Sequence, residues 1–303
     1  MLIAVTGATG FLGRYIVNHL LEVGHQCRCW HRPESNRGGF VDGGGGIEWI
    51  PGDLSDEGAA AELVRGVDAV VHSALMRPTR SGWSGAEGNL LTFAQINVMG
   101  TLRLMEAAKK AGAGRFVFIS TCAVHDVILA DRKLDEAHPL WLRSHYGAHK
   151  AALEAFVHSY GLGAGWPICA VRPTGIYGID HPVEASKWYD LVQRVLKGEP
   201  IASAKGGKEV HAGDVARAVG VLLNAPAEQI AGQAFNCYDM YVAEQDIARI
   251  AAKIAGRSAK IEAMNEGPRN QIETGKLRSL GMTFGGAELL ERTVAELVHA
   301  VKG

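Results

Sequence analysis

The chain has 303 residues, of which 47% are apolar and 21% are charged. This balance is typical of a folded globular protein and excludes a disordered one, and the length suits one principal domain with a smaller lobe. Lysine and arginine number 31 against 32 aspartate and glutamate residues, so no bulk charge favours nucleic acid or an anionic membrane as a partner.

The first half of the chain alternates short apolar runs with helical patterns. The runs expected to form strands are Leu2–Thr6, Gln26–Trp30, Ile47–Pro51, Ala69–His72, Phe116–Ser120 and Pro167–Val171. The helices expected between them are Phe11–Val23, Glu57–Arg65, Leu90–Ala111 and His145–Tyr160. Nearly continuous apolar strands that alternate with helices predict an α/β fold with a doubly wound parallel sheet, which we assign to residues 1–172.

The second half, after about Arg172, has longer loops and is mainly helical. Its expected helices are Glu184–Lys197, Asp214–Asn224, Glu244–Gly256 and Ala287–Val301. We interpret residues 173–303 as a smaller substrate-binding lobe. This boundary is not sharp, because a short strand at Ala234–Cys237 is able to return to the sheet.

No feature of the chain predicts export or membrane insertion. The first expected strand begins at Leu2, and no apolar run approaches the roughly 20 residues that span a bilayer. The five cysteines form neither a metal-ligand pattern nor a disulfide framework, and free thiols fit a reducing compartment. We therefore expect a cytoplasmic protein that binds neither membrane nor nucleic acid.

A glycine-rich turn follows the first strand directly. The segment Thr6-Gly7-Ala8-Thr9-Gly10-Phe11-Leu12-Gly13 lies between a strand and a helix, which is the context of a Rossmann-type dinucleotide site. In such a site Gly7 permits the tight turn, Gly10 lets a pyrophosphate approach the backbone, and Gly13 lets the helix pack closely. The amides of the helix N-terminus hold the phosphates. The expected cofactor contacts are Gly7, Thr9, Gly10, Phe11, Leu12 and Gly13.

The choice between NAD and NADP depends on the end of the second strand. That strand runs into Arg32 rather than into an acidic residue that would accept from ribose hydroxyls. An arginine suits a 2′-phosphate and favours NADP, unless Arg32 is a solvated loop residue. Asp53, after the third strand, either accepts a hydrogen bond from the adenine amino group or caps the helix that starts near Ser55 or Asp56.

Tyr146 and Lys150 are four residues apart at the start of an expected helix, and therefore lie one turn apart on one face. The pKa of a phenol is about 10 and must fall toward 7 for useful proton exchange. A nearby ammonium favours the phenolate, as does the positive nicotinamide of an oxidised cofactor. The pair therefore predicts an acid/base function. His145 and His149 lack the glutamate and the third ligand of a zinc site, so no metal is expected.

Together these motifs resemble those of the extended short-chain dehydrogenases/reductases, the NAD-dependent epimerase/dehydratase family. The segments that carry the resemblance are Thr6–Gly13, Asp53–Leu54, Val71–Ala74, Asn97–Thr101, Tyr146–Lys150, Arg172–Gly178 and Val210–Ala216. They occur in the family's order and cover nearly the whole chain. The resemblance implies that Leu54, Ser73, Ala74 and Pro173 also contact the cofactor and that Lys150 binds the nicotinamide ribose.

The resemblance also implies a third catalytic group, a serine or threonine about 25 residues before the tyrosine. Ser120 and Thr121 are both candidates, and the spacing to Tyr146 favours Thr121. Its hydroxyl would hold the substrate oxygen while Tyr146 transfers the proton and the nicotinamide transfers hydride.

The helix expected at Leu90–Ala111 contains Asn97, the fourth member of the family's catalytic set. By resemblance, Asn97 would support Lys150 through its backbone and a water, although an asparagine that merely kinks the helix is the structural alternative. The same helix is apolar on more than one face. With the Tyr146 helix it would form the four-helix interface typical of this family, which predicts a homodimer.

Departures from the family pattern narrow the reaction. Cys122-Ala123 replaces the Asp-Glu of nucleotide-sugar 4,6-dehydratases, and Gly206–Glu209 lacks the phosphate-binding arginine of sugar-nucleotide epimerases. We therefore expect an NAD(P)-dependent oxidoreductase acting on a small carbonyl or alcohol by a Thr-Tyr-Lys mechanism. A nucleotide-sugar epimerase is the alternative. A non-catalytic dinucleotide sensor is the third hypothesis, which the presence of both Tyr146 and Lys150 disfavours. Loops near residues 75–89, 123–144 and 177–208 are expected to set the substrate.

Overall fold

The computed structural model describes residues 1–77, 89–262, 267 and 269–303. Contacts divide the chain into two compact units. The first contains Met1–Pro173, Val215–Cys237 and Ile272–Met282, and the second contains Thr174–Asp214, Tyr238–Gln271 and Thr283–Gly303. Most of the first loop expected to set the substrate, residues 78–88, lies outside the described residues.

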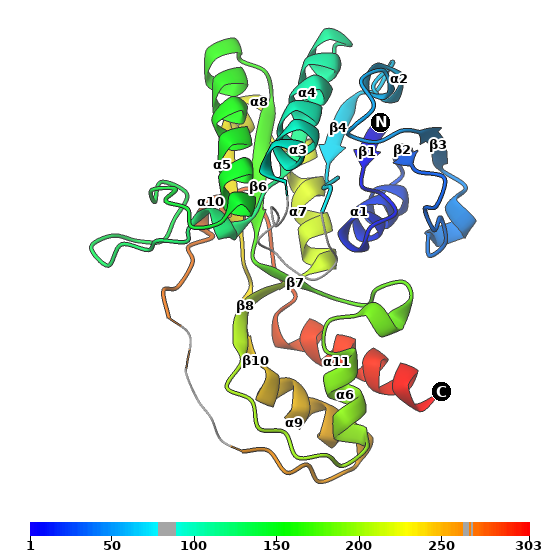
Figure 1. Ribbon diagram of the computed structural model, residues 1–303, viewed down its shortest axis with the longest axis vertical. Coiled ribbons are helices and arrows are strands. Elements are labelled where there is room, and N and C mark those ends of the chain that lie inside the picture. Colours follow the sequence, from blue (N-terminus) through cyan, green and yellow to red (C-terminus); the bar gives the residue numbers. More distant parts are fainter. Residues whose placement is uncertain (78–88, 263–266, 268) are drawn as a thin grey trace. The chain divides into compact units, whose positions relative to one another are not determined.

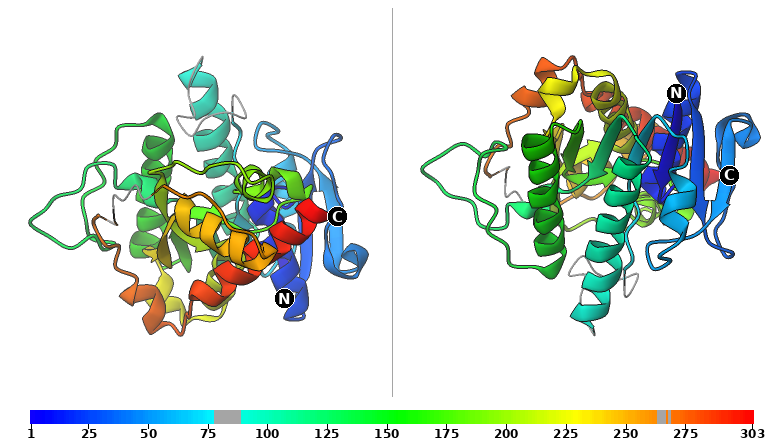
Figure 2. Two further views of the ribbon diagram at one scale, coloured as in Figure 1. Left: turned by 90° about the horizontal axis from the view of Figure 1, so that it is seen from below. Right: turned by 90° about the horizontal axis from the view of Figure 1, so that it is seen from above.

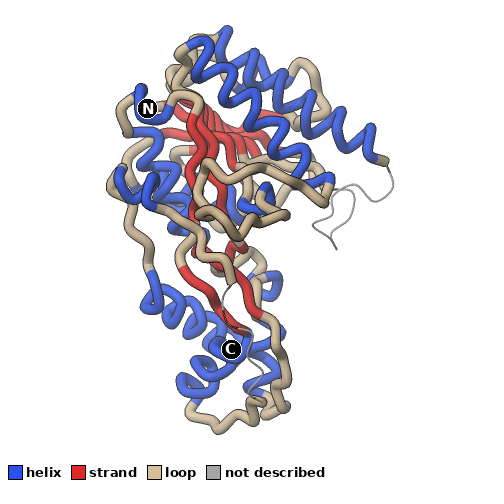
Figure 3. The backbone as a smooth tube through the Cα atoms, turned by 90° about the vertical axis from the view of Figure 1, so that its left-hand side faces the viewer, coloured by secondary structure: helices blue, strands red, loops and turns tan. Residues whose placement is uncertain are grey.

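The first unit is built on a seven-stranded parallel sheet with the order β3-β2-β1-β4-β5-β6-β9 (Figures 1 and 3). Its strands are β1 Leu2–Thr6, β2 Gln26–His31, β3 Ile47–Pro51, β4 Ala69–His72, β5 Arg115–Ile119, β6 Ile168–Pro173 and β9 Gln233–Cys237. The order reverses between β1 and β4, so their carboxyl ends form the topological switch point where ligands bind in such sheets. The predicted α/β, doubly wound Rossmann-type sheet is confirmed.

Helices cover both faces of this sheet. They are α1 Phe11–Glu22, α2 Ala59–Leu63, α3 Leu90–Ala94, α4 Gly100–Lys110, α5 His145–His158, α7 Ala212–Asn224, α8 Ala227–Ile230 and α10 Gly275–Ser279, with short 3-10 turns at Val41–Gly44 and Cys122–Val124. Helices α2, α4 and α5 share one apolar core with the sheet, and α4 and α5 run side by side in Figures 1 and 2. Helix α7 lies next to α1, where a Cβ on Gly220 would come within 2.7 Å of the His19 ring.

The helix predicted at Leu90–Ala111 is interrupted by a π-helical turn at Gln95–Met99, and a second π turn, Ser159–Gly163, follows α5. The first turn ends against Gly100, whose lack of a side chain is needed because a Cβ there would overlap the Leu54 carbonyl. The periodicity of apolar residues does not distinguish a π turn from regular helix, so the sequence did not predict this break.

The second unit combines three helices with a small sheet. Its elements are β7 Gly175–Tyr177, β8 Gly206–His211, β10 Met240–Ala243, a 3-10 turn at Val183–Ala185, α6 Tyr189–Leu196, α9 Glu244–Ala255 and α11 Gly286–Lys302. The three helices pack their apolar faces together, with Val192, Ala251 and Leu297 in the core. The three-stranded sheet β10-β8-β7 was not predicted, because β8 begins Gly-Gly-Lys and β7 has only three residues.

Two parts of the chain after residue 173 belong to the first unit. Val215–Cys237 is held there because β9 pairs with β6 along five residues. Ile272–Met282 is held there by a bridge between Ile272 and Leu134. Among the described residues, none of the helices combines the length and the apolar character that crossing a bilayer demands.

Candidate active site

In the glycine turn after β1, backbone atoms pack so closely that little room is left for side chains. Gly7 has a φ of 71°, and a Cβ on it would lie 2.8 Å from the amide nitrogen of Ala74. The Gly10 amide donates to the Gly7 carbonyl over 3.0 Å, and a Cβ on Gly13 would overlap that same carbonyl. Side chains at Gly7 and Gly13 are therefore sterically excluded, which leaves bare backbone at the switch point.

Helix α1 starts from this turn with Gly10 as its N-cap, which supplies no side-chain hydrogen bond to the first amides. Thr9, Phe11 and Leu12 are only partly buried, and Gly10 is exposed. Uncapped amides at the positive end of a 12-residue helix fit a pyrophosphate. The residues at this position therefore fit a dinucleotide.

The segment after β4 forms the neighbouring wall. The amides of Ser73 and Ala74 donate to the Thr6 hydroxyl over 3.2 and 3.1 Å. The Asn97 side chain accepts from the Met76 amide over 2.8 Å and donates to the Met76 carbonyl over 3.0 Å. Asn97 thus clamps this segment, and within the described residues its side chain bonds Met76 and Phe93 rather than Lys150.

Asp53 lies just beyond β3 and does not cap the next helix. Its Oδ1 accepts from the amide and hydroxyl of Ser55, whereas Asp56 accepts from the amides that start α2. Burial alone would raise the pKa of Asp53, but the Ser55 hydrogen bonds and the charge of Arg32 together hold it below its usual value. Leu54 is buried beneath α4.

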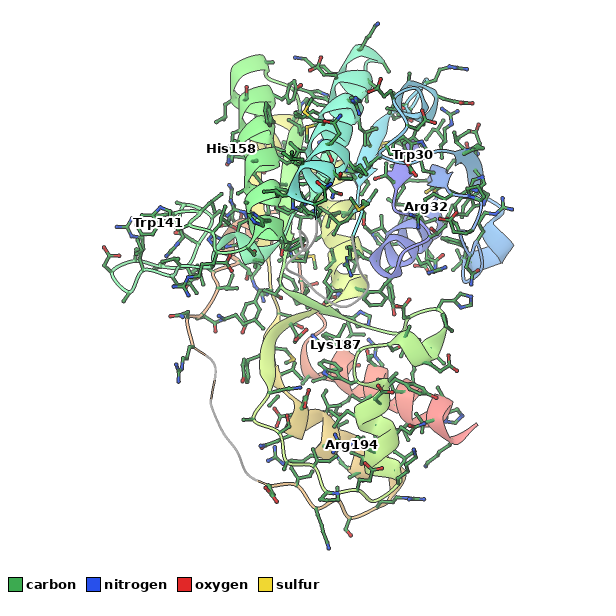
Figure 4. The ribbon with its side chains drawn as sticks, in the orientation of Figure 1. Trp30, Arg32, Trp141, His158, Lys187 and Arg194 are labelled. Carbon is green, nitrogen blue, oxygen red and sulfur yellow. The ribbon has the colours of Figure 1, made fainter. Side chains whose placement is uncertain are left out.

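Arg32 stands at the end of β2 in Figure 4 and is mostly exposed. Its Nε lies 3.0 Å from Glu34 Oε1, and the two side chains are 58% and 67% exposed. Arg32 is thus close to Asp53 on the rim of the sheet but is held by a neighbouring carboxylate. A phosphate that binds this guanidinium would share it with the Glu34 carboxylate.

Tyr146 sits in the first turn of α5, which Ser144 caps by accepting from the Gly147 amide over 3.1 Å. Tyr146 is 8% exposed, and its hydroxyl interacts with that of Thr121. Burial raises the pKa of the Tyr146 phenol, while the Thr121 bond and the charge of Arg77 oppose the rise. The protein groups therefore shift this pKa upward, opposite to the lowering by Lys150 that the sequence predicted.

Lys150 is buried one turn further along α5. Its Nζ donates to the Ile119 carbonyl over 2.7 Å and lies 4.6 Å from the centre of the Phe118 ring. Burial lowers the pKa of Lys150 to about 7, against the carboxylate of Glu154, which raises it. An ammonium with this pKa loses its proton near neutral pH. Burial therefore has the largest effect on the charge of Lys150.

The two candidate hydroxyls after β5 have different partners. Ser120 donates to the buried carboxylate of Glu154. Thr121 accepts from the Ala123 amide over 3.1 Å and bonds the Tyr146 hydroxyl. Of the pair, only Thr121 is joined to the phenol, which favours it over Ser120 as the hydroxyl of the site.

A buried ion pair beneath this site was missed by the sequence analysis. Arg172 and Glu154 are 1% and 0% exposed, with Nη2 and Oε2 separated by 2.6 Å. Arg172 also donates to the Glu136 carbonyl over 3.3 Å and approaches His125 Nε2 at the same distance. An arginine inside an apolar strand and a glutamate one turn after Lys150 were the signals available in the sequence.

The remaining candidates are buried packing residues and one exposed histidine. The ring of His149 lies 5.0 Å from that of Phe93, and burial with the charge of Lys150 lowers its pKa to about 3. His145 on the same helix is exposed, and no group of three or more candidate ligands meets within the described ranges. Burial raises the pKa of Cys122 to about 12, so its thiol is protonated at neutral pH. Pro173 is buried at the end of β6.

Comparison with known proteins bears on this arrangement. Residues 3–237 match the model of the NAD dependent epimerase/dehydratase family. A 3 beta-hydroxysteroid dehydrogenase/Delta 5-->4-isomerase of Mycobacterium tuberculosis is 30% identical over 201 residues, 65% of this chain and 52% of that protein. The chain thus spans about half the length of the curated relatives it matches first.

Solved structures share the fold along the whole chain. The dTDP-glucose 4,6-dehydratase DesIV of Streptomyces venezuelae, with NAD bound, has a TM-score of 0.77 and 26% identity and covers 99% of this chain and 97% of its own. The UDP-glucose 4-epimerase of Thermus thermophilus, in complex with NAD, has a TM-score of 0.78 and 22% identity, covering 100% and 99%.

Proposed function

The chain belongs to the NAD dependent epimerase/dehydratase family, whose members are enzymes, and we propose that it transfers hydride between the nicotinamide of NAD(P) and a small carbonyl or alcohol. The observation that carries this proposal is that α5 places Tyr146 and Lys150 one turn apart beside the end of β5, where Lys150 Nζ donates to the Ile119 carbonyl two residues before Thr121. These groups follow β5 and begin α5, at the carboxyl edge of the sheet that also carries the glycine turn.

In this proposal the dinucleotide is held by bare backbone and by the amides of α1. Gly7, Gly10 and Gly13 leave room for the pyrophosphate, and Ser73 and Ala74 pass beside it. The bound cofactor supplies a hydride acceptor and, when oxidised, a positive charge. That charge would oppose the raised pKa of the Tyr146 phenol, which protein groups alone do not lower.

The chain's own residues would handle the proton. Thr121 would orient the substrate oxygen, and Tyr146 would exchange a proton with it. Lys150 would hold the nicotinamide ribose. Because its pKa is about 7, its amine would be able to take up or release a proton when Tyr146 exchanges one with the substrate. Asn97 would hold residues 73–76 in place beside the cofactor through its two hydrogen bonds to Met76.

Two observations favour a small substrate over a nucleotide sugar. The segment of β8 that would carry a phosphate-binding arginine instead contains Glu209, whose buried side chain is paired with Lys187 at 2.5 Å. Lys187 is labelled in Figure 4. Gly206–His211 therefore contains no arginine that could bind a diphosphate with two parallel hydrogen bonds. The hydroxysteroid dehydrogenase relatives, whose names describe alcohol oxidation, support the same choice. A nucleotide-sugar epimerase remains the second candidate, because solved relatives include UDP-glucose 4-epimerases.

A substrate screen separates these candidates. The full chain is assayed with ketones, aldehydes, secondary alcohols and sugar nucleotides while absorbance follows NAD(P)H. Net oxidation or reduction of a small substrate supports the proposal. Interconversion of sugar nucleotides without net NADH supports the epimerase, and tight cofactor binding with no turnover across the screen supports the sensor.

The preference for NADP rests on Arg32, and it is tested by removing the charge of Arg32 or of Glu34 in turn. Arg32→Ala is expected to weaken NADP binding about 10-fold or more, the effect of losing a charge-assisted hydrogen bond to phosphate, and to leave NAD binding within about twofold. Glu34→Ala, which frees the guanidinium, should tighten NADP binding. Calorimetric titration gives both dissociation constants. Equal losses for the two cofactors in Arg32→Ala would remove the argument for NADP.

We also propose that the protein is a cytoplasmic homodimer. Large apolar side chains are exposed on the helices that the sequence assigned to an interface, namely Leu90, Leu91, Met99 and Phe156. Leu162, in the π-helical turn that follows α5, is 69% exposed and is the residue chosen for substitution. Light scattering is expected to give twice the chain mass, and Leu162→Glu should shift the protein toward the monomer. A monomeric wild type at micromolar concentration contradicts the interface.

A further inference from the structure

His72, the last residue of β4, is 1% exposed and has a polar partner on each ring nitrogen. Nδ1 lies 2.6 Å from the Thr6 hydroxyl, at the end of β1. Nε2 lies 2.8 Å from the Thr101 hydroxyl, in α4. The proposed mechanism gives this buried imidazole no role.

The neighbouring bonds fix which nitrogen carries the proton. The Thr101 hydroxyl donates to the Asn97 carbonyl over 2.6 Å, so its oxygen is left to accept from His72 Nε2–H. Nδ1 is then an acceptor, and the Thr6 hydroxyl donates to it. This leaves the Thr6 oxygen free to accept from the amides of Ser73 and Ala74, as observed. The hydrogen bonds therefore run in one direction from the β4 exit to Asn97.

The chain of bonds closes into a ring. Asn97, reached through His72 and Thr101, grips Met76 with its side-chain amide, and the backbone from Met76 returns to Ala74 on Thr6. Residues 73–76 are thus fixed at one end by the turn that would hold the pyrophosphate and at the other by the π-helical turn.

The surroundings keep His72 uncharged. Burial, together with the charges of Lys150 and His149, lowers its pKa to about 3. The ring stacks on Phe118 with centroids 5.7 Å apart, and Phe118 also underlies Lys150. A neutral imidazole retains one donor and one acceptor, whereas an imidazolium would lose the bond from Thr6.

We propose that His72, held as the Nε2–H tautomer, is a positioning residue with two separable roles: Nδ1 supports cofactor affinity at the glycine turn through Thr6, and Nε2 supports the placement of Asn97 through Thr101. The inference rests on the proposed function for its catalytic half, whereas its binding half requires only that NAD binds at the glycine turn.

Two variants of the full chain separate the two ends of the relay. An asparagine side chain is able to replace Nδ1 as the acceptor for the Thr6 hydroxyl, but it does not reach Thr101. A glutamine side chain is able to replace Nε2 as the donor to Thr101, but it leaves the Thr6 hydroxyl without an acceptor. His72→Gln is expected to weaken NAD binding about 10-fold, within the cost of an unsatisfied buried polar group, with turnover at saturating NAD little changed. His72→Asn is expected to keep the dissociation constant for NAD within about twofold and to lower saturating turnover several-fold.

Calorimetry with NAD measures affinity without turnover, so a failure of the proposed enzymatic function is distinguishable from a failure of the relay. If the dissociation constant for NAD and the saturating turnover change by the same amounts in both variants, His72 is only a packing residue and the proposal is overturned. The ¹⁵N spectrum of histidine-labelled wild type gives an independent result. A protonated Nε2 and an unprotonated Nδ1 support the relay, and the opposite tautomer or an imidazolium at neutral pH overturns it even where a variant fails to fold.

Discussion

Tyr146→Phe is expected to lower turnover at least about 100-fold while leaving the dissociation constant for NAD(P) almost unchanged. The substitution removes only the hydroxyl, so the ring keeps its contact with His149, 5.4 Å away between centroids. The proton donor is lost, and Thr121 retains the Ala123 amide as a partner. Steady-state kinetics on the best substrate of the screen, with calorimetry for the cofactor, measures both quantities.

Tyr160→Phe is the matched control for this experiment. Tyr160 lies in the π-helical turn that follows α5, at the opposite end of the helix from Tyr146, and donates its hydroxyl to the carboxylate of Glu106. Its turnover should equal that of the wild type. Activity retained in Tyr146→Phe would refute the proposed role of the phenol.

Arg172→Met is expected to destabilise the protein by about 3–5 kcal/mol, because it leaves the carboxylate of Glu154 buried without its cation. Ser120 remains as a donor to Glu154 but carries no charge. The double variant Arg172→Met with Glu154→Leu should recover most of this loss, since two apolar side chains need no charge partner. Urea unfolding of the full chain, followed by tryptophan fluorescence, measures the free energy of unfolding.

An exposed pair in the same unit provides the control. Arg103 Nη2 lies 2.5 Å from Glu57 Oε1, and the glutamate is 76% exposed. Arg103→Ala should cost at most about 1 kcal/mol, as surface ion pairs do. A loss in Arg172→Met no larger than that in Arg103→Ala would show that the buried pair is not required for stability.

Local patterns predicted most of the first unit. The strands β1, β3 and β4 begin and end where the apolar runs do, since parallel strands covered on both faces need continuous apolar sequence. The glycine turn was equally legible, because Gly7 and Gly13 have no room for a side chain. Boundaries at β2, β5 and β6 moved by one or two residues, where hydrogen bonding rather than hydrophobicity decides the end.

What the sequence missed depends on contacts between distant residues. The pair of Arg172 and Glu154 forms only once β6 lies against α5, and no spacing in the chain reveals it. The same burial reverses the expected shift in the pKa of Tyr146 and brings that of Lys150 down to about 7. A phenol and an amine one turn apart are easily recognised, whereas their protonation follows from desolvation, which needs the fold.

The choice between Ser120 and Thr121 shows the same limit. Adjacent residues at a strand end point in different directions, so spacing alone supports either. The structure commits Ser120 to Glu154 and joins Thr121 to Tyr146.

A crystal structure of the full chain with NAD bound shows whether the nicotinamide lies where Tyr146 is able to exchange a proton with the substrate. We expect the pyrophosphate at the amides of Gly10, Phe11 and Leu12, the nicotinamide ribose on Lys150 Nζ, and the nicotinamide ring beside the Tyr146 hydroxyl. A cofactor held at the glycine turn whose nicotinamide lies away from both Tyr146 and Lys150 would contradict it.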